Sequence, residues 1–156
     1  MGFYARALLR NSHAFGLRGL VDFAASEGVI VRVEPASAVD DGGWREAELW
    51  APGAAVPVEI DISRRDEPAS LLDDEITEFS DELDDADERV PGAAARIREH
   101  LAATRAVVAV RVLASDGHTG PAIGNCVLDW YAQRDDVLFQ VDAQGFYDGD
   151  ELLVAS

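Results

Sequence analysis

"AVVAVRVL", residues 106–113, is the stretch that decides the fold of this 156-residue chain, because only Arg111 interrupts its apolar side chains. A nearly continuous run of Val, Ala and Leu at this length is typical of a strand inside a sheet, covered on at least one face. We therefore predict a central β-strand here and assign the rest of the chain around it.

The preceding strand is predicted at "AVPVEIDISR", residues 55–64, where apolar and polar residues alternate. Alternation with a period of two puts one set of side chains on each face of a sheet. Glu59 and Asp61 are expected to face outward. Pro57 has no amide hydrogen to donate, so it predicts that this strand lies at a sheet edge. The side chains expected to face inward are Val56, Val58, Ile60 and Ile62.

The other elements follow from the same two periodicities. Ser12 is the expected N-cap of the first helix, and Gly28 stands where a helix often ends. The predicted strands are 2–10, 29–35 and 44–51, with further strands within 137–154, and the predicted helices are 11–28, 91–105 and 120–136.

The order of elements is β-α-β-β-β, two helices, then β-α-β-β. It predicts an α+β fold, with a largely antiparallel sheet and helices packed on one face. We expect a single domain over 1–156, made of a first part (1–66), the two helices (67–104) and a second part (105–156). The two outer parts suggest a β-α-β-β pseudo-repeat. In topology alone, such paired βαβββ modules resemble the metal-dependent vicinal oxygen chelate enzymes, and the likeness carries no residue assignment.

The segment "DDEITEFSDELDDADERV", residues 73–90, concentrates negative charge. Ten of the thirty acidic residues lie in 73–88, and without them the net charge of −17 would be −7. At about 100° per residue, the segment predicts an amphipathic helix that ends near Asp84, followed by a loop to Pro91. The expected apolar stripe is Leu72, Ile76, Phe79 and Leu83. The opposite, solvent-facing side carries Asp74, Glu78, Asp81 and Asp85.

Charge and composition exclude several classes of function. A net charge of −17 argues against nucleic acid and anionic membranes as partners, because both would be repelled. All thirteen basic residues are Arg, which excludes Schiff-base chemistry on lysine and a P-loop lysine. No stretch has the length of a signal or transmembrane segment, and a single Cys allows no internal disulfide, so the chain is expected to be cytoplasmic.

No recognisable catalytic, metal or cofactor motif is present. His13, His100 and His118 lack metal-site spacing, and we expect them to be exposed or singly hydrogen-bonded. Cys126 is expected to be an inert buried thiol, with activation by His118 as the alternative. The carboxylates Asp148, Asp150 and Glu151 could form an acid–base pair, but Asp148-Gly149 is more simply a turn. No EF-hand register or phosphate loop fits, so no catalytic residue, metal or cofactor is predicted.

Two tryptophans allow two interpretations. If Leu49 faces inward, Trp44 and Trp50 share the outer face of their strand with Glu46 and Glu48, as in a protein-binding patch. Alternatively, the acidic helix covers these strands with its apolar stripe, which is the interpretation we favour.

Taken together, these features predict a non-catalytic acidic binding protein: an inhibitor, an immunity-type protein or a nucleic-acid mimic. It would dock a basic partner protein through Asp74, Glu78, Asp81 and Asp85. Two alternatives stay open: a small enzyme or ligand-binding domain built from scattered residues, and a domain of a salt-adapted organism whose acidity serves solubility. The sequence predicts no oligomeric state.

Overall fold

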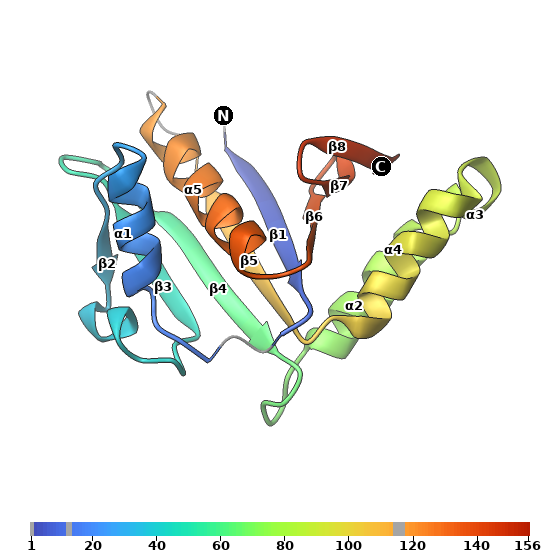
Figure 1. Cartoon of the computed structure of the whole chain (residues 1–156), viewed down its shortest axis with the longest axis horizontal. Coiled ribbons are helices and arrows are strands. Elements are labelled where there is room, and N and C mark those ends of the chain that lie inside the picture. Colours follow the sequence, from blue (N-terminus) through green and yellow to red (C-terminus); the bar gives the residue numbers. More distant parts are fainter. Residues whose placement is uncertain (1, 12–13, 114–117) are drawn as a thin grey trace.

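The computed structural model describes residues 2–11, 14–113 and 118–156, and its strands form one antiparallel sheet in the order β2-β3-β4-β5-β1-β6-β7-β8 (Figure 1). The strands are β1 (Phe3–Leu9), β2 (Arg32–Glu34), β3 (Glu46–Trp50), β4 (Val58–Arg64), β5 (Ala106–Val112), β6 (Val137–Val141), β7 (Gly145–Asp148) and β8 (Glu151–Ala155). The helices are α1 (Arg18–Ser26), a 3-10 helix (Ala36–Val39), α2 (Leu72–Glu82), α3 (Ala86–Arg89), α4 (Pro91–Ala103) and α5 (Thr119–Arg134). The predicted α+β class with an antiparallel sheet is confirmed.

The strand β5 is central, as its apolar run predicts. It pairs with β4 on one side and with β1 on the other. Val108 and Val110 point into the core on one face, and Val107 points into a second core on the other face. Only Arg111 of this strand is exposed.

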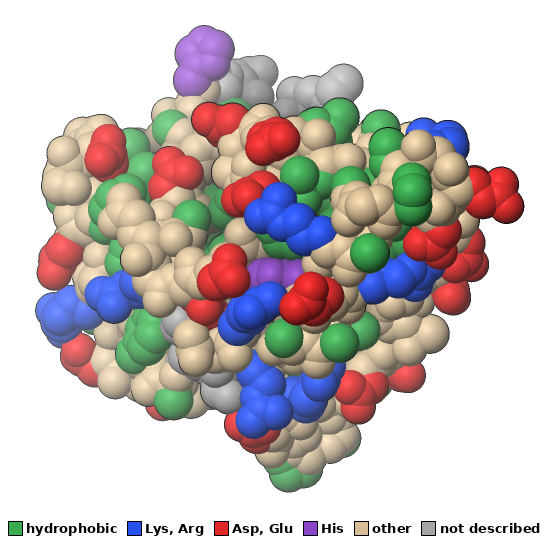
Figure 2. Space-filling model, turned by 45° about the vertical axis from the view of Figure 1, so that its right-hand side comes forward, with side chains coloured by type: hydrophobic (Ala, Val, Ile, Leu, Met, Phe, Trp, Pro, Cys, Tyr) green, Lys and Arg blue, Asp and Glu red, His purple; other side chains and the backbone are tan. Residues whose placement is uncertain are grey.

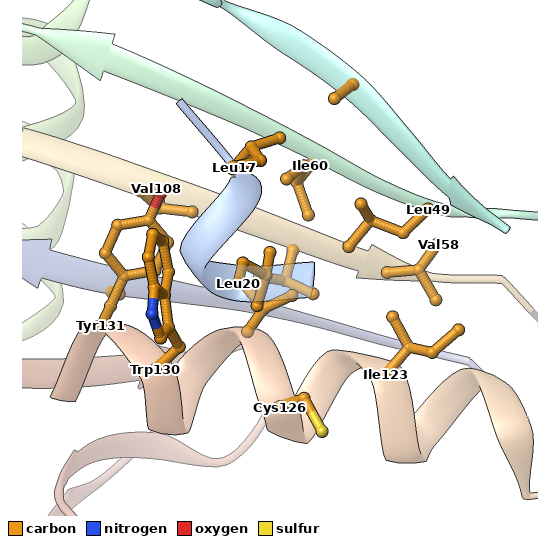
Figure 3. Close-up of a cluster of buried hydrophobic side chains, with 14 of the residues drawn as sticks. Leu17, Leu20, Leu49, Val58, Ile60, Val108, Ile123, Cys126, Trp130 and Tyr131 are labelled. Carbon is orange, nitrogen blue, oxygen red and sulfur yellow. The ribbon is translucent and has the colours of Figure 1, made fainter. Parts of the chain in front are cut away.

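The larger core lies under α1 and α5, which run side by side over the sheet (Figure 1). Ile123, Cys126, Trp130 and Tyr131 of α5 meet Leu20 of α1 and strand residues such as Leu49, Val58 and Ile60 (Figure 3). The ring of Trp130 packs edge-to-face on Tyr131, with centroids 4.9 Å apart. This core fixes the sheet face on which α1 and α5 lie.

The helices α2 to α4 pack on the opposite face, whereas the sequence predicted all helices on one face. Their apolar side chains meet strand residues that alternate with those of the larger core. The strand residues of this second core are Leu8, Val107, Leu138, Phe146 and Val154. If this second face were open to solvent, these apolar residues would lie in water. The α2–α4 unit covers the half of the face that carries them. Figure 1 shows this unit apart from α1 and α5.

Three local expectations are wrong. The strand β4 is not an edge strand, because it pairs with both β3 and β5. Pro57 precedes the first ladder residue, Val58, so its missing amide hydrogen breaks no strand pairing. Val56 does not face the core and is 37% exposed. The first helix begins at Arg18, with Leu17 at its N-cap position, and Ser12 lies outside the described residues.

Strand, helix and three further strands do occur in both halves of the chain, but the halves join the sheet differently. In the first half, the last strand of the meander, β4, meets the sheet centre at β5. In the second half, it is the first strand of the meander, β6, that meets the centre at β1. The shared order of elements therefore does not produce two equivalent sheet halves.

Candidate acidic binding surface

The acidic helix α2 has the predicted amphipathic form. Leu72, Phe79 and Leu83 are buried, and Phe79 packs edge-to-face on Phe146 of β7 with ring centroids 6.4 Å apart. Asp73, Asp74 and Glu75 lie in its first turn, where negative charge meets the positive end of the helix dipole. The helix ends at Glu82, close to the predicted end, but the expected loop to Pro91 contains the single helical turn α3.

The carboxylates of this segment divide into paired and unpaired groups. Arg98 of α4 binds both Asp84, at 3.1 Å, and Asp87, at 2.7 Å. Asp73 lies 3.5 Å from Arg65. The four predicted site residues are all exposed, and none forms an ion pair with another described residue: Asp74, Glu78, Asp81 and Asp85. Figure 2 brings the α2–α4 side forward and shows acidic side chains (red) with Arg (blue) between them.

A second acidic region lies on the open half of the sheet face that α2 to α4 leave uncovered. Strand register places its carboxylates in two rows across adjacent strands. The first row is Glu34, Glu48 and Glu59, on β2, β3 and β4. The second row is Glu46 and Asp61, on β3 and β4. Like charges directly opposite each other in a sheet are destabilising, so both rows oppose folding. We call these five residues the acidic sheet face.

Arg residues neutralise only part of the acidic sheet face. Arg32 binds Glu34, and Arg111 donates to Glu59 at 3.1 Å. Among the described residues, Glu46, Glu48 and Asp61 have no ion-pair partner. The unpaired carboxylates are therefore neighbours on the two strands β3 and β4.

The acidic sheet face lines a hollow of about 600 Å³. Tyr4 and Arg111 form one side, Glu34 and Pro35 form the other, and Ala109 leaves room between Asp61 and β1. Arg6 and Arg111 both lie against the ring of Tyr4, with guanidinium carbons 4.1 Å and 4.8 Å from its centroid. The hollow thus has acidic strands in its floor and a cationic, aromatic wall on the β1 side.

Electrostatic contacts connect the acidic sheet face to α2. Burial, together with Glu46 and Glu59, raises the pKa of the Asp61 carboxyl, against the lowering effect of Arg111 and Arg6. Burial also raises the pKa of Glu75 on α2, against the lowering effect of Arg6, and the charges of Asp61 and Glu78 add to this rise. Glu75 is therefore within electrostatic reach of Asp61, Glu78 and Arg6. Carboxylates of α2 and of the acidic sheet face therefore interact electrostatically, and the positive charge of Arg6 opposes both.

The two histidines that the structure describes, His100 and His118, have separate environments and do not form a site. His100 is buried, and its Nε2–H donates to the carbonyl oxygen of Leu8 at 2.8 Å, so it is a singly hydrogen-bonded core residue, as predicted. His118 is exposed at the N-cap position of α5. His13 lies outside the described residues.

The thiol of Cys126 is buried in the larger core, as predicted. Burial raises its pKa, and Asp129 and Glu27 add to the shift, so the environment disfavours the thiolate. His118 stands eight residues before it on α5, a rise of about 12 Å along the helix axis. That separation is too long for direct activation of the thiol.

The acidic residues near the C-terminus form a turn and an ion pair. Asp148 ends β7 and pairs with Glu151 of β8 in the ladder, and Gly149 adopts a positive φ of 57° between them. Asp148 also binds Arg96 of α4. The turn interpretation is therefore confirmed.

The tryptophans do not form the predicted patch. Trp44 is buried in the larger core, whereas Trp50 is half-buried and Arg32 lies 5.7 Å from its ring. The favoured interpretation, in which the acidic helix covers β3, is also wrong, because α2 packs on Phe146 and the second core. The open sheet face is the functional candidate that sequence reasoning missed. The available signal was the acidic alternation in both "EAELW" (46–50) and "VEIDIS" (58–63).

Within residues 2–11, 14–113 and 118–156, no three His, Cys, Asp or Glu side chains are grouped so that they would hold a metal ion. Across the same residues, every helix is too short or too polar to cross a bilayer. Comparisons of the chain with models of protein families, with curated proteins and with solved structures gave no match.

Proposed function

We propose that this protein is a non-catalytic binding protein that docks a basic partner protein through its acidic surface. The observation that carries the proposal is the arrangement of unpaired carboxylates. Asp74, Glu78 and Asp81 of α2, and Asp85 just before α3, are exposed without ion-pair partners among the described residues. Glu75 of α2 is within electrostatic reach of Asp61 on β4. Extended negative potential of this kind accelerates encounter with a basic protein and favours it over acidic competitors.

A rigid support makes the exposed side of α2 suited to docking. The buried residues Leu72, Phe79 and Leu83 anchor α2 on the second core, so its outward carboxylates are held in a fixed pattern. Binding through charges that are already held in place loses less conformational entropy than binding through charges on a mobile tether. An inhibitor, an immunity-type protein and a nucleic-acid mimic all use such preorganised charge, and they differ in the partner that they neutralise.

The test is affinity capture from a lysate of the source organism at low salt, with mass spectrometry of the retained proteins. The α2 variant, Asp74→Asn/Glu78→Gln/Asp81→Asn/Asp85→Asn, removes three unpaired charges from α2 and a fourth from the turn that follows it. The control Asp22→Asn/Glu27→Gln/Glu99→Gln/Asp150→Asn removes four exposed carboxylates elsewhere and leaves the same net charge. We expect the wild type and the control to retain the same basic proteins and the α2 variant to lose them. Equal retention by both variants would reject docking through α2.

A further inference from the structure

The acidic sheet face is poorly explained by folding alone. Glu46 lies directly opposite Asp61, and Glu48 lies directly between Glu34 and Glu59. Such like-charge pairs weaken a sheet. Neutral polar side chains at these positions would keep the strands equally soluble without that penalty. Residues that oppose stability at a surface hollow are characteristic of sites kept for binding.

The spacing of the rows fits one kind of occupant. Residues two apart on a strand lie about 6.8 Å apart, so the pair Glu46–Asp61 and the pair Glu48–Glu59 repeat at that distance along β3 and β4. An extended peptide repeats its same-side residues at the same distance. Two Arg or Lys side chains at positions i and i+2 would therefore each meet a pair of carboxylates.

The surroundings of the hollow set where this occupant lies. Arg6 and Arg111, packed against Tyr4 and paired with Asp142 and Glu59, close the β1 side of the hollow and offer no unpaired negative charge to a positive segment. The unpaired Glu46, Glu48 and Asp61 attract it over β3 and β4, where no helix covers the sheet. The hollow of about 600 Å³ is in the size range that accommodates a small ligand or a few side chains.

From this complementarity we infer that the acidic sheet face receives an extended, positively charged segment of the partner, with basic residues at alternating positions. The inference rests on the proposed function and specifies which surface recognises the spacing of basic residues in the partner. In this arrangement α2 attracts the partner over a distance, and the acidic sheet face determines how the bound segment aligns with the carboxylate pairs.

The test uses purified protein and two fluorescein-labelled peptides of equal composition, four Arg and four Ser, in alternating order (RSRSRSRS) or in paired order (RRSSRRSS). The paired peptide has no two Arg residues two positions apart. Fluorescence anisotropy at low salt gives their dissociation constants, and we expect the alternating peptide to bind more tightly than the paired peptide. The variant Glu46→Gln/Glu48→Gln/Asp61→Asn should weaken alternating-peptide binding by about fivefold to thirtyfold, the effect of losing three partly screened charge pairs. The control Asp22→Asn/Glu27→Gln/Glu99→Gln has the same net charge and should bind nearly as the wild type does.

The possible outcomes separate this inference from the proposed function. If the sheet-face variant binds like its control while the α2 variant loses binding, the inference is overturned and the proposed function stands. If neither the wild type nor any variant binds a basic peptide or protein, both fail. Equal binding of the two peptides would overturn the inferred register. If L-arginine methyl ester alone binds as tightly as the alternating peptide, the hollow takes a small cation, and the inference of a partner segment is again overturned.

Discussion

Neutralising Glu48 is expected to make the protein more stable, which is unusual for a substitution within a sheet. Glu48 stands directly between Glu34 and Glu59, and each opposed like-charge pair costs about 0.2–1 kcal/mol. Arg32 and Arg111 bind the two outer carboxylates and offset part of this cost. We therefore expect Glu48→Gln to raise the free energy of unfolding by about 0.5 kcal/mol and the melting temperature by about 1–2 °C.

Salt identifies the cause of this gain. The Debye length is about 30 Å in 0.01 M salt and about 3 Å in 1 M salt, so repulsion across neighbouring strands is nearly removed at the higher concentration. Urea unfolding followed by circular dichroism should show the gain of Glu48→Gln in 0.01 M NaCl and its loss in 1 M NaCl. Asp22→Asn on α1 removes an exposed carboxylate away from the sheet face and serves as the matched control. The reasoning is refuted if Glu48→Gln lowers stability in 0.01 M NaCl, or if its gain persists unchanged in 1 M NaCl.

Three further predictions concern pH and packing. Burial raises the pKa of Asp61, Glu75 and Glu82, so between their ordinary pKa of about 4 and the raised values the folded chain holds more protons than the unfolded chain. Their contribution to stability therefore falls as pH rises through that window. Asp61 interacts with Arg111, Glu46, Arg6 and Glu59. Asp61→Asn removes one of these titrating groups, so urea midpoints measured from acid to neutral pH should fall less steeply in this variant than in the wild type. Phe79→Ala should lower the free energy of unfolding by about 3–5 kcal/mol in urea, because the ring is buried against Phe146, whereas the more exposed Ile76→Ala should cost less. His100→Leu should cost about 0.5–1.5 kcal/mol in the same assay, because it removes the buried hydrogen bond to the carbonyl of Leu8. The exposed His118→Ala should leave the urea midpoint unchanged.

The elements whose environment is encoded locally were predictable. The apolar run of 106–113 places β5 in the sheet centre, because a strand of that composition needs cover on its faces. The spacing of Leu72, Phe79 and Leu83 predicts the buried side of α2, since the helical period alone brings them together. The turn at Gly149 follows from its freedom to adopt positive φ.

The features set by long-range pairing were not predictable from one sequence. The helix α2 packs on Phe146, which is 67 residues after Phe79, and does not pack on β3. No pattern in the sequence of α2 itself determines this choice of partner. Pro57 illustrates the same limit, because a proline removes a strand hydrogen bond only when it lies inside the paired part of a strand, and the sequence does not show where pairing begins. The acidic sheet face requires the register of β2, β3 and β4, since "EAELW" and "VEIDIS" each look like an ordinary strand with one solvent side. Only their alignment reveals carboxylates opposite carboxylates.

The distribution of Arg supports the proposed binding role. Where carboxylates crowd together, pairing with Arg relieves their mutual repulsion. The chain follows this rule in several places: Arg98 binds Asp84 and Asp87, Arg18 binds Asp40, and Arg96 binds Asp148. It departs from the rule on the outward side of α2 and on β3 and β4. Exposed carboxylates without an ion pair also occur elsewhere among the described residues, at Asp22, Glu27, Glu99 and Asp150. On α2 and on β3 and β4, however, such carboxylates stand in rows on packed elements, and this is the arrangement that the proposed basic partner would match with its own positive charge.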